Sequence, residues 1–242
     1  MTGLPWENTA RFHEAKRKAG SKVRMAAFRT TLPDPLPGEE ANVALAADRL
    51  AEIVVPPGRV FSMNNTLGPY TAARGYKRGP VYVGSTISTT IGGGVCKIAT
   101  TLYNAAVLAN LAVIARSPHG MPVPYVPPGQ DATVSYGEQD FSFNNGTAHP
   151  ILIWAGTRGN TLEIAFYGYK KPPRVVWHHR ILSRQAIPTI KRKGSNPLGK
   201  EIPGAEGMTV RTWLSIIEAS GKTTTKQLGI DRYRPMPRVV FR

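Results

Sequence analysis

Apolar residues recur every three to four positions in two segments of the chain, and this spacing is typical of amphipathic helices. The first segment, residues 41–54, ends before Pro56-Pro57-Gly58, which cannot continue a helix. The second segment, about residues 95–110, follows Gly92-Gly93-Gly94 directly. The buried stripe of this second helix is predicted to be Ile98, Leu102, Ala105, Ala106 and Ala109.

Short runs rich in β-branched and aromatic residues predict β-strands elsewhere in the chain. In the first half, strands are expected at residues 23–31, 60–63, 81–83 and 111–115. Two hairpin turns, Asn144-Asn145-Gly146 and Arg158-Gly159-Asn160, mark a later antiparallel group. The strands of that group are expected at residues 133–136, 141–143, 151–155 and 161–167. The predicted fold class is therefore α+β, with a helix packed across an antiparallel sheet.

Composition divides the chain into four parts. With 242 residues, 24 glycines and 21 prolines, it is long enough for a main and a small domain and is rich in turns. After Lys171-Pro172-Pro173 the chain becomes basic and poor in apolar runs. We expect a basic N-terminal arm or polar helix, a main domain, a basic linker and a small β-rich C-terminal domain, at residues 1–20, 21–170, 171–197 and 198–242. Strands of the small domain are expected at residues 208–215, 216–224 and 238–241, around a turn at Ser220-Gly221-Lys222.

The net charge is strongly positive. Lysine and arginine total 31 against 15 acidic residues, which gives a formal charge of +16. A surplus of this size predicts an anionic partner: nucleic acid, an acidic cell-wall polymer or an anionic membrane surface. No zinc-finger spacing or other nucleic-acid-binding signature accompanies the charge, which disfavours nucleic acid. Protein partners are not predicted by any pattern.

The single cysteine, Cys96, stands at the predicted start of the second helix. Amide N–H groups in a first helical turn lack partners and stabilise anions, so a thiol placed there tends to have a lowered pKa. Gly92, Gly93 and Gly94 allow positive φ and a close approach of substrate to the backbone. One cysteine excludes an intramolecular disulfide, which fits either a cytosolic protein or a Gram-positive envelope protein.

A thiolate nucleophile needs a base, and the base needs an orienting partner. His119 follows the strand expected at residues 111–115, and Asp131 stands before the next expected strand. A cysteine on a helix followed by histidine and an acid on successive strands is the order of papain-like and transglutaminase-like folds. Asn64 and Tyr103 are further candidates for substrate binding.

Structural roles remain open for each candidate residue. Cys96 is equally consistent with a small buried hydrophobe, His119 with a hydrogen bond to the proline-rich loop, and Asp131 with a turn cap. Asn64 and Tyr103 could satisfy loop backbone. Adjacent residues on a strand face opposite ways, so His178 and His179 do not form a metal site. The glycines lack the spacing of a phosphate-binding loop, and no metal or cofactor is predicted.

Several motifs resemble the VanW family, in one order over residues 25–168. They are residues 57–64, Leu67-Gly68-Pro69, Gly75-Tyr76, Pro80, residues 92–104, residues 119–127, residues 131–134, Phe143-Asn144-Asn145 and residues 150–153. Residues 198–242 are similar to the small all-β, glycine-containing module that often follows this domain. The residues carrying that second likeness are Gly204, Gly207, Val210, Arg211, Gly221, Tyr233 and Pro235.

The resemblance implies a role in the bacterial cell envelope and in glycopeptide resistance. Residues 1–30 contain no apolar run long enough for a signal peptide or membrane span, so the chain read literally is not exported. Many relatives have glutamine after the motif cysteine, whereas this chain has Lys97, which is expected to stabilise a thiolate.

The leading hypothesis is a cysteine-dependent amide hydrolase or acyltransferase acting on cell-wall peptides. Cys96 would be the nucleophile, His119 the base and Asp131 its orienting group, with backbone N–H groups near residues 94–97 holding the oxyanion. The alternatives are a non-catalytic basic protein that binds or scaffolds an anionic wall polymer, and a subunit of a larger assembly.

Overall fold

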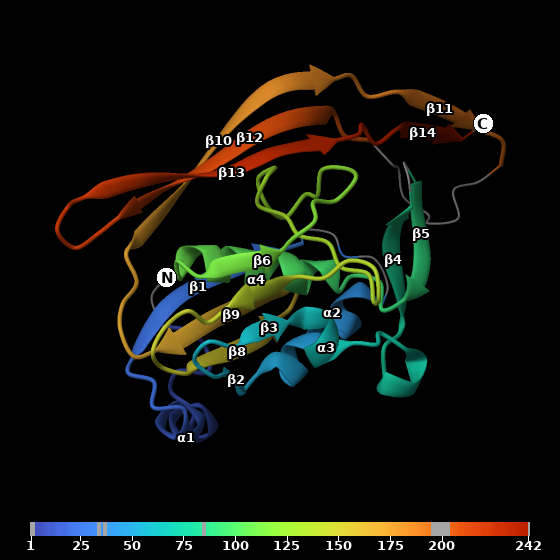
Figure 1. Cartoon of the computed structure of the whole chain (residues 1–242). Helices are drawn as coiled ribbons and strands as arrows, with labels where there is room; N and C mark the ends of the chain where they lie inside the picture. Colours follow the sequence, from blue (N-terminus) through green and yellow to red (C-terminus); the bar gives the residue numbers. More distant parts are fainter. Residues whose placement is uncertain (1–2, 33–34, 36–37, 84–85, 195–203, 242) are drawn as a thin grey trace.

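A four-stranded antiparallel sheet with the order β1-β9-β8-β2 forms the centre of the main domain (Figure 1). The computed structural model describes residues 3–32, 35, 38–83, 86–194 and 204–241. The strands of the central sheet are β1 (Val23–Thr31), β9 (Thr161–Gly168), β8 (Ile151–Arg158) and β2 (Ile53–Val55). Hydrogen-bonded register along β1, β9 and β8 fixes which side chains share each face.

Helix α1 (Ala10–Lys18) packs on one face of this sheet. The side-chain oxygen of Thr9 caps the helix by accepting a hydrogen bond from the N–H of Phe12. The ring of Phe12 meets Trp154 and Tyr167 with centroid distances of 5.2 and 4.7 Å. The part of residues 1–20 expected as an arm or polar helix is thus a helix docked by its apolar face.

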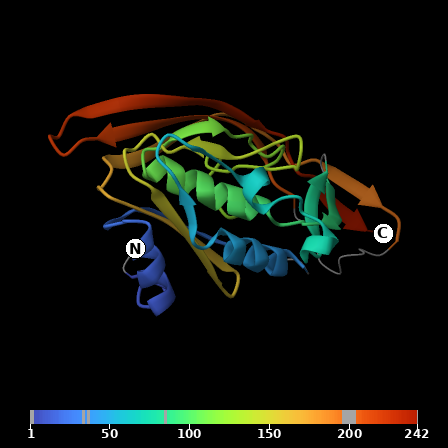
Figure 2. The same cartoon turned by 60° about the horizontal axis from the view of Figure 1, so that its bottom comes forward.

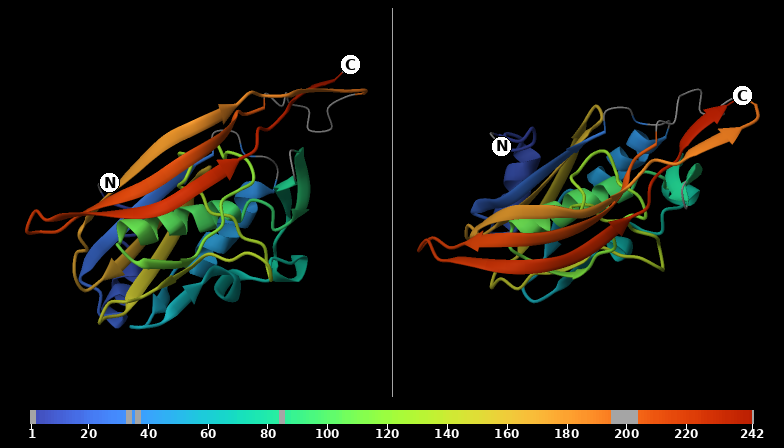
Figure 3. Two further views of the ribbon diagram at one scale, coloured as in Figure 1. Left: turned by 45° about the horizontal axis from the view of Figure 1, so that its top comes forward. Right: turned by 90° about the horizontal axis from the view of Figure 1, so that it is seen from above.

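Helices α2 (Glu39–Leu50) and α4 (Cys96–Leu108) pack on the opposite face of the sheet. A second antiparallel sheet then covers α4, with the order β10-β12-β13 (Figure 3). Its strands are β10 (Arg174–Gln185), β12 (Gly207–Ile217) and β13 (Thr223–Tyr233). Trp177 of β10 meets Tyr103 of α4 edge to face, with ring centroids 5.6 Å apart.

The position of α4 between two sheets explains its composition. Every residue from Lys97 to Val107 is buried, well beyond the stripe predicted from the spacing. A helix covered on both sides needs apolar or small residues all round. Figure 2 shows the resulting layers: α1, the central sheet, α2 with α4, and the C-terminal sheet.

Smaller elements surround these layers. A three-stranded sheet has the order β3-β7-β6, β4 and β5 form a hairpin, and β11 pairs with β14 in parallel. Their bounds, with those of the two short helices, are β3 (Val60–Ser62), α3 (Met63–Leu67), η1 (Ala72–Arg74), β4 (Arg78–Val83), β5 (Thr86–Ile91), β6 (Ala112–Ala115), β7 (Ser142–Asn144), β11 (Thr189–Arg192) and β14 (Arg238–Phe241).

The mixed α+β class with antiparallel sheets is confirmed, and three segments differ from expectation. The segment expected as a basic linker contains β10, whose residues pair with β12 along its whole length. The turn expected at residues 220–222 separates β12 from β13 as predicted, but the strand bounds differ, because β12 continues to Ile217 and β13 begins only at Thr223. Residues 133–136 form two isolated bridges, Thr133 to Ser117 and Ser135 to Gln139, in place of a strand, because the backbone of Val134 between them contacts the sulfur of Cys96.

Candidate active site

The glycine turn before α4 holds Cys96 against the body of the protein. Gly92 and Gly94 have φ of 79° and 98°, which side-chain-bearing residues rarely adopt. A Cβ on Gly93 would lie 2.2 Å from the backbone of Gly79, and the carbonyl of Gly93 accepts a hydrogen bond from Asn42 Nδ2 at 2.8 Å. The space around Gly92 and Gly93 is therefore filled by the protein itself.

The thiol of Cys96 is half-buried at the first residue of α4. Its Sγ lies 3.3 Å from the hydroxyl oxygen of Thr133, 3.5 Å from the amide nitrogen of Val134 and 3.6 Å from the carbonyl oxygen of Val134. The sulfur of Cys96 therefore lies among polar groups and is not surrounded by aliphatic side chains alone.

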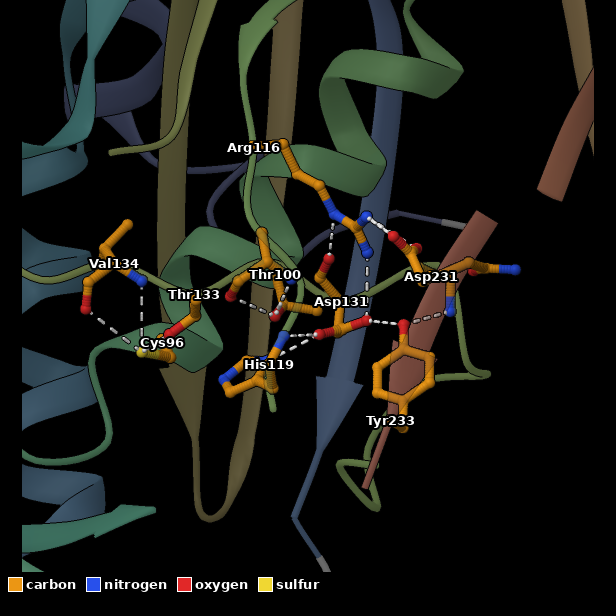
Figure 4. A network of polar contacts seen from close by, with 12 residues as sticks. Cys96, Thr100, Arg116, His119, Asp131, Thr133, Val134, Asp231 and Tyr233 are labelled. Atoms are coloured by element: carbon orange, nitrogen blue, oxygen red, sulfur yellow. Dashed lines mark hydrogen bonds and ion pairs between the residues drawn. The ribbon is translucent and has the colours of Figure 1, made fainter. Parts of the chain in front are cut away.

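His119 and Asp131 form a buried pair next to this sulfur (Figure 4). Nδ1 of His119 lies 2.7 Å from Oδ2 of Asp131, and the same oxygen accepts the backbone N–H of His119 at 2.7 Å. The imidazole ring lies between the sulfur and the carboxylate. The structure thus brings together the three residues that the sequence proposed as nucleophile, base and orienting group.

The environment shifts the pKa values of all three groups. Burial opposes the charged thiolate, but the hydrogen bond and positive charge of His119 outweigh it and lower the pKa of Cys96. Burial also opposes the imidazolium, yet the hydrogen bonds of Asp131 and Cys96 raise the pKa of His119 to about 9. His119 and Arg116 lower the pKa of Asp131 against the effect of its burial. The three shifts favour a thiolate beside an imidazolium over a neutral thiol beside a neutral imidazole.

Three polar side chains that sequence reasoning missed complete the surroundings of Asp131. Nη2 of Arg116 donates to Oδ1 of Asp131 at 3.1 Å, and the hydroxyl of Tyr233 donates to the same oxygen. Nη1 of Arg116 also binds both carboxylate oxygens of Asp231, at 2.8 and 2.7 Å. Arg116 precedes His119 by three residues and could have been considered. Tyr233 and Asp231 lie about a hundred residues later, so no local pattern indicates them.

Asn64 and Tyr103 lie in structural positions. Nδ2 of Asn64 donates to the carbonyl oxygens of Ser135 and Gln139, so this side chain holds a loop. Tyr103 is buried between α4 and β10, and its ring lies 5.2 Å from the guanidinium of Arg116. Among the described residues, neither side chain is hydrogen-bonded to Cys96 or His119.

Lys97 also points away from the thiol. Its Nζ lies 2.9 Å from the carboxylate of Glu40 and 2.7 Å from the carbonyl oxygen of Asn160, in a fully buried position. The expected stabilisation of the thiolate by this lysine is therefore not the arrangement found, because the ammonium is engaged on the other side of α4.

Two backbone amides near the thiol are available to a ligand. The N–H groups of Val95 and Lys97 donate to the carbonyls of Gly92 and Gly94, at 3.3 and 3.0 Å. Within the described residues, the N–H groups of Gly94 and Cys96 have no hydrogen-bond partner. Unpartnered amides in a first helical turn favour a developing negative charge.

The described residues contain neither a cluster of metal-ligating side chains nor a membrane-spanning helix. No group of three or more His, Cys, Asp or Glu side chains is arranged there to hold a metal ion. No helix in the described part of the chain has the length and apolar character needed to cross a bilayer.

Fold and site together define a mixed α+β protein with a helix-start cysteine beside a buried histidine–aspartate pair. The chain belongs to the VanW-like family, whose model, described as "VanW like protein", matches residues 38–167. Cys96, His119 and Asp131 all lie inside the matched region, whereas Asp231 and Tyr233 lie outside it.

Two curated proteins are similar over this region. The "Uncharacterized protein YoaR" of Bacillus subtilis is 43% identical over 126 residues, which cover 52% of this chain and 42% of that protein. The "Vancomycin B-type resistance protein VanW" of Enterococcus faecalis is 30% identical over 118 residues, which cover 47% of this chain and 43% of that protein. The match thus spans less than half the length of either relative. No solved structure matches the chain.

Proposed function

We propose that this protein is a cysteine-dependent amide hydrolase or acyltransferase. The observation that carries the proposal is the hydrogen bond between Nδ1 of His119 and Asp131 at 2.7 Å, with the ring lying beside the sulfur of Cys96. A buried carboxylate that fixes one ring nitrogen directs the other toward a nucleophile, which is the logic of nucleophile–histidine–acid triads. The order of cysteine on a helix, then histidine, then acid supports a papain-like or transglutaminase-like arrangement.

The reaction would proceed through an acyl-enzyme. The thiolate of Cys96 attacks the amide carbonyl, and a sulfur–carbon bond forms as the carbon–nitrogen bond breaks. His119 gives its proton to the leaving amine. Water, in a hydrolase, or an amine, in a transferase, then attacks the thioester, transfers a proton to His119 and releases the thiolate. The N–H groups of Gly94 and Cys96 are the proposed donors to the oxyanion.

Peptides of the bacterial cell wall are the proposed substrate class. The support is the likeness to a protein named for vancomycin resistance, 30% identical over 118 residues. Wall stem peptides offer amide bonds for this chemistry, and a location in the cell envelope is part of the same proposal.

Turnover of stem peptides by the wild type and by Cys96→Ala tests the proposal. Wild type should release a new amine or exchange one, with a thioester on Cys96 visible by intact-mass spectrometry, and Cys96→Ala should do neither. The melting temperature of Cys96→Ala should stay near that of the wild type, because the thiol is half-buried and small. A large loss of stability in this variant, with no turnover in the parent, would identify a core cysteine instead.

A second candidate function is binding of an anionic wall polymer. Alternate residues of β12, namely Val210, Thr212 and Leu214, are buried, so Arg211 and Trp213 face away from the core. Arg211 stands directly opposite Arg180 of β10, a like-charge pairing that costs stability. An anion lying along this outer face would relieve that repulsion. His178 stacks on Trp213 beside it, with ring centroids 5.4 Å apart.

Salt dependence separates the two candidates. Binding of a teichoic-acid-type polymer should weaken steeply between low and physiological salt, because exposed charges are screened. The double variant Arg180→Gln, Arg211→Gln should weaken binding, whereas Cys96→Ala should leave it unchanged. Binding that ignores both salt and the arginine substitutions would remove this second candidate.

A further inference from the structure

The C-terminal sheet reaches the candidate site from outside the family-matched region. The match ends at residue 167, whereas Tyr233 is the last residue of β13 and meets Asp131 across 102 positions of sequence. Figure 4 shows this tyrosine on the side of Asp131 away from His119.

We infer that Tyr233 is a positioning residue of the Cys96–His119–Asp131 site, so that the main domain and the C-terminal sheet together build one composite site. The inference rests on the proposed function and adds the group that fixes the orienting acid.

Four hydrogen bonds hold the carboxylate of Asp131 in place. Oδ2 accepts both the backbone N–H and Nδ1 of His119, and Oδ1 accepts from Arg116 and Tyr233. The carboxylate is only 1% exposed, so water cannot replace a missing donor without rearrangement. Rotation of the carboxylate would break bonds at both of its oxygens, and the plane of the acid sets the plane of the imidazole.

The hydroxyl of Tyr233 is the donor in its hydrogen bond with Asp131. The N–H of Gly129 donates to this hydroxyl oxygen at 2.8 Å. A hydroxyl has one hydrogen to donate, and an N–H donor cannot accept it, so the hydrogen points to Asp131. Tyr233 is 3% exposed and therefore keeps this geometry away from competing solvent.

Two further contacts fix the sheet to the same loops. The N–H of Arg234 donates to the carbonyl of Gly120, next to His119, at 2.8 Å. A Cβ on Gly129 would lie 2.2 Å from the hydroxyl oxygen of Thr212 in β12, so the loop before Asp131 fits closely against the sheet. The residues flanking both His119 and Asp131 are thus held from β12 and from the end of β13.

The test is the pH profile of Cys96 alkylation by iodoacetamide in the full chain. Tyr233→Phe should move the thiolate midpoint upward and slow alkylation by about threefold to tenfold at pH values below the wild-type midpoint, because the thiolate fraction changes about tenfold per pKa unit there. Tyr167→Phe is the matched control. Tyr167 is 1% exposed, and its hydroxyl likewise accepts from one donor, Trp6, and donates to one carboxylate, Glu7, but it lies on the α1 side of the central sheet.

Asp231→Asn provides a second variant that does not alter the tyrosine. Without the carboxylate of Asp231, the guanidinium of Arg116 has Asp131 as its remaining ion-pair partner. Arg116 then neutralises more of the charge of Asp131, and Asp131 stabilises the imidazolium of His119 less. The part of the pH profile that reports the titration of His119 should therefore move to lower pH. Tyr167→Phe should retain both wild-type limbs.

Each outcome has one meaning. Shifts in Tyr233→Phe and Asp231→Asn with an unshifted Tyr167→Phe support the inference. The inference is overturned if both site variants keep the wild-type pH profile, or if the control shifts equally. Neither result would contradict the proposed role of Cys96 as nucleophile. An ordinary thiol midpoint in the wild-type protein would instead contradict the proposed function itself. If Tyr233→Phe fails to fold, Asp231→Asn decides alone.

Discussion

Two adjacent residues, Cys96 and Lys97, have separate tasks although they share one helical turn. Successive side chains on a helix point in directions about 100° apart, so one neighbour can face the site while the other enters the core. Lys97 is fully buried and bound to Glu40 and Asn160. Sequence proximity alone therefore overstated the electrostatic link between the ammonium and the thiol.

Lys97→Gln should affect stability and leave the thiol unchanged. Losing the ammonium leaves the partly buried carboxylate of Glu40 without its ion-pair partner, at a cost of about 1–3 kcal/mol in the free energy of unfolding. Chemical denaturation measures this cost. The midpoint of Cys96 alkylation should match the wild type, and a midpoint shifted upward would restore Lys97 as a thiolate partner.

His119→Ala should raise the pKa of Cys96, because the hydrogen bond and charge of His119 are what lower it against burial. Alkylation near pH 7 should slow at least tenfold, since one pKa unit changes the thiolate fraction about tenfold. Stopped alkylation followed by mass spectrometry reports the rate. His149→Ala serves as a control, because that ring stacks on Tyr169 away from the site. Equal alkylation rates in His119→Ala and the wild type would show that the imidazole does not lower the pKa of the thiol.

At the scale of elements, the glycine turn before α4 is shaped by the close approach of its backbone to that of β4. Gly93 and Gly79 meet so closely that neither position has room for a Cβ atom. The turn sets where α4 begins and hence where the sulfur stands. The sequence indicated the turn and the helix start within a residue, because consecutive glycines followed by a periodic apolar stripe are a local signal.

Gly93→Ala should destabilise the protein by about 1–3 kcal/mol or more, because the added methyl group overlaps backbone that cannot rotate away. Gly146→Ala is the matched control, since nothing lies within 4 Å of a Cβ built there and its φ is not positive. Thermal melts compare the two. Similar melting temperatures for both variants would show that the turn can widen.

At the scale of the whole molecule, the proton balance of the site predicts the pH dependence of stability. The pKa of Asp131 is lowered below its ordinary 3.8, so its contribution is present above that pH and is lost as pH falls through the folded value. The raised pKa of His119 makes stability fall as the pH rises from about 6.5 to about 9. The lowered pKa of Cys96 makes stability rise with pH below its ordinary 9.0, so the contributions of the two groups oppose each other.

Melting temperatures should therefore fall below about pH 4, and Asp131→Asn should reduce that acid slope. Differential scanning calorimetry from pH 3 to 9 measures both. An unchanged acid slope in Asp131→Asn would show that other carboxylates dominate acid unfolding.

The sequence predicted what local patterns encode. The α+β class, the start of α4 and the candidate set Cys96, His119 and Asp131 all follow from spacing and motif order. The prediction of a basic linker at residues 171–197 missed β10, because this strand is polar on its exposed face and has few apolar runs. Arg116, Asp231 and Tyr233 were missed as partners of Asp131, since their convergence depends on one sheet folding back over α4.

The hydrogen bond from Tyr233 to Asp131 also has a temporal consequence. During synthesis, Cys96, His119 and Asp131 all leave the ribosome more than a hundred residues before Tyr233. The nascent chain therefore exposes a thiol whose orienting acid still lacks its last donor, and full organisation waits until the second sheet has closed over the first.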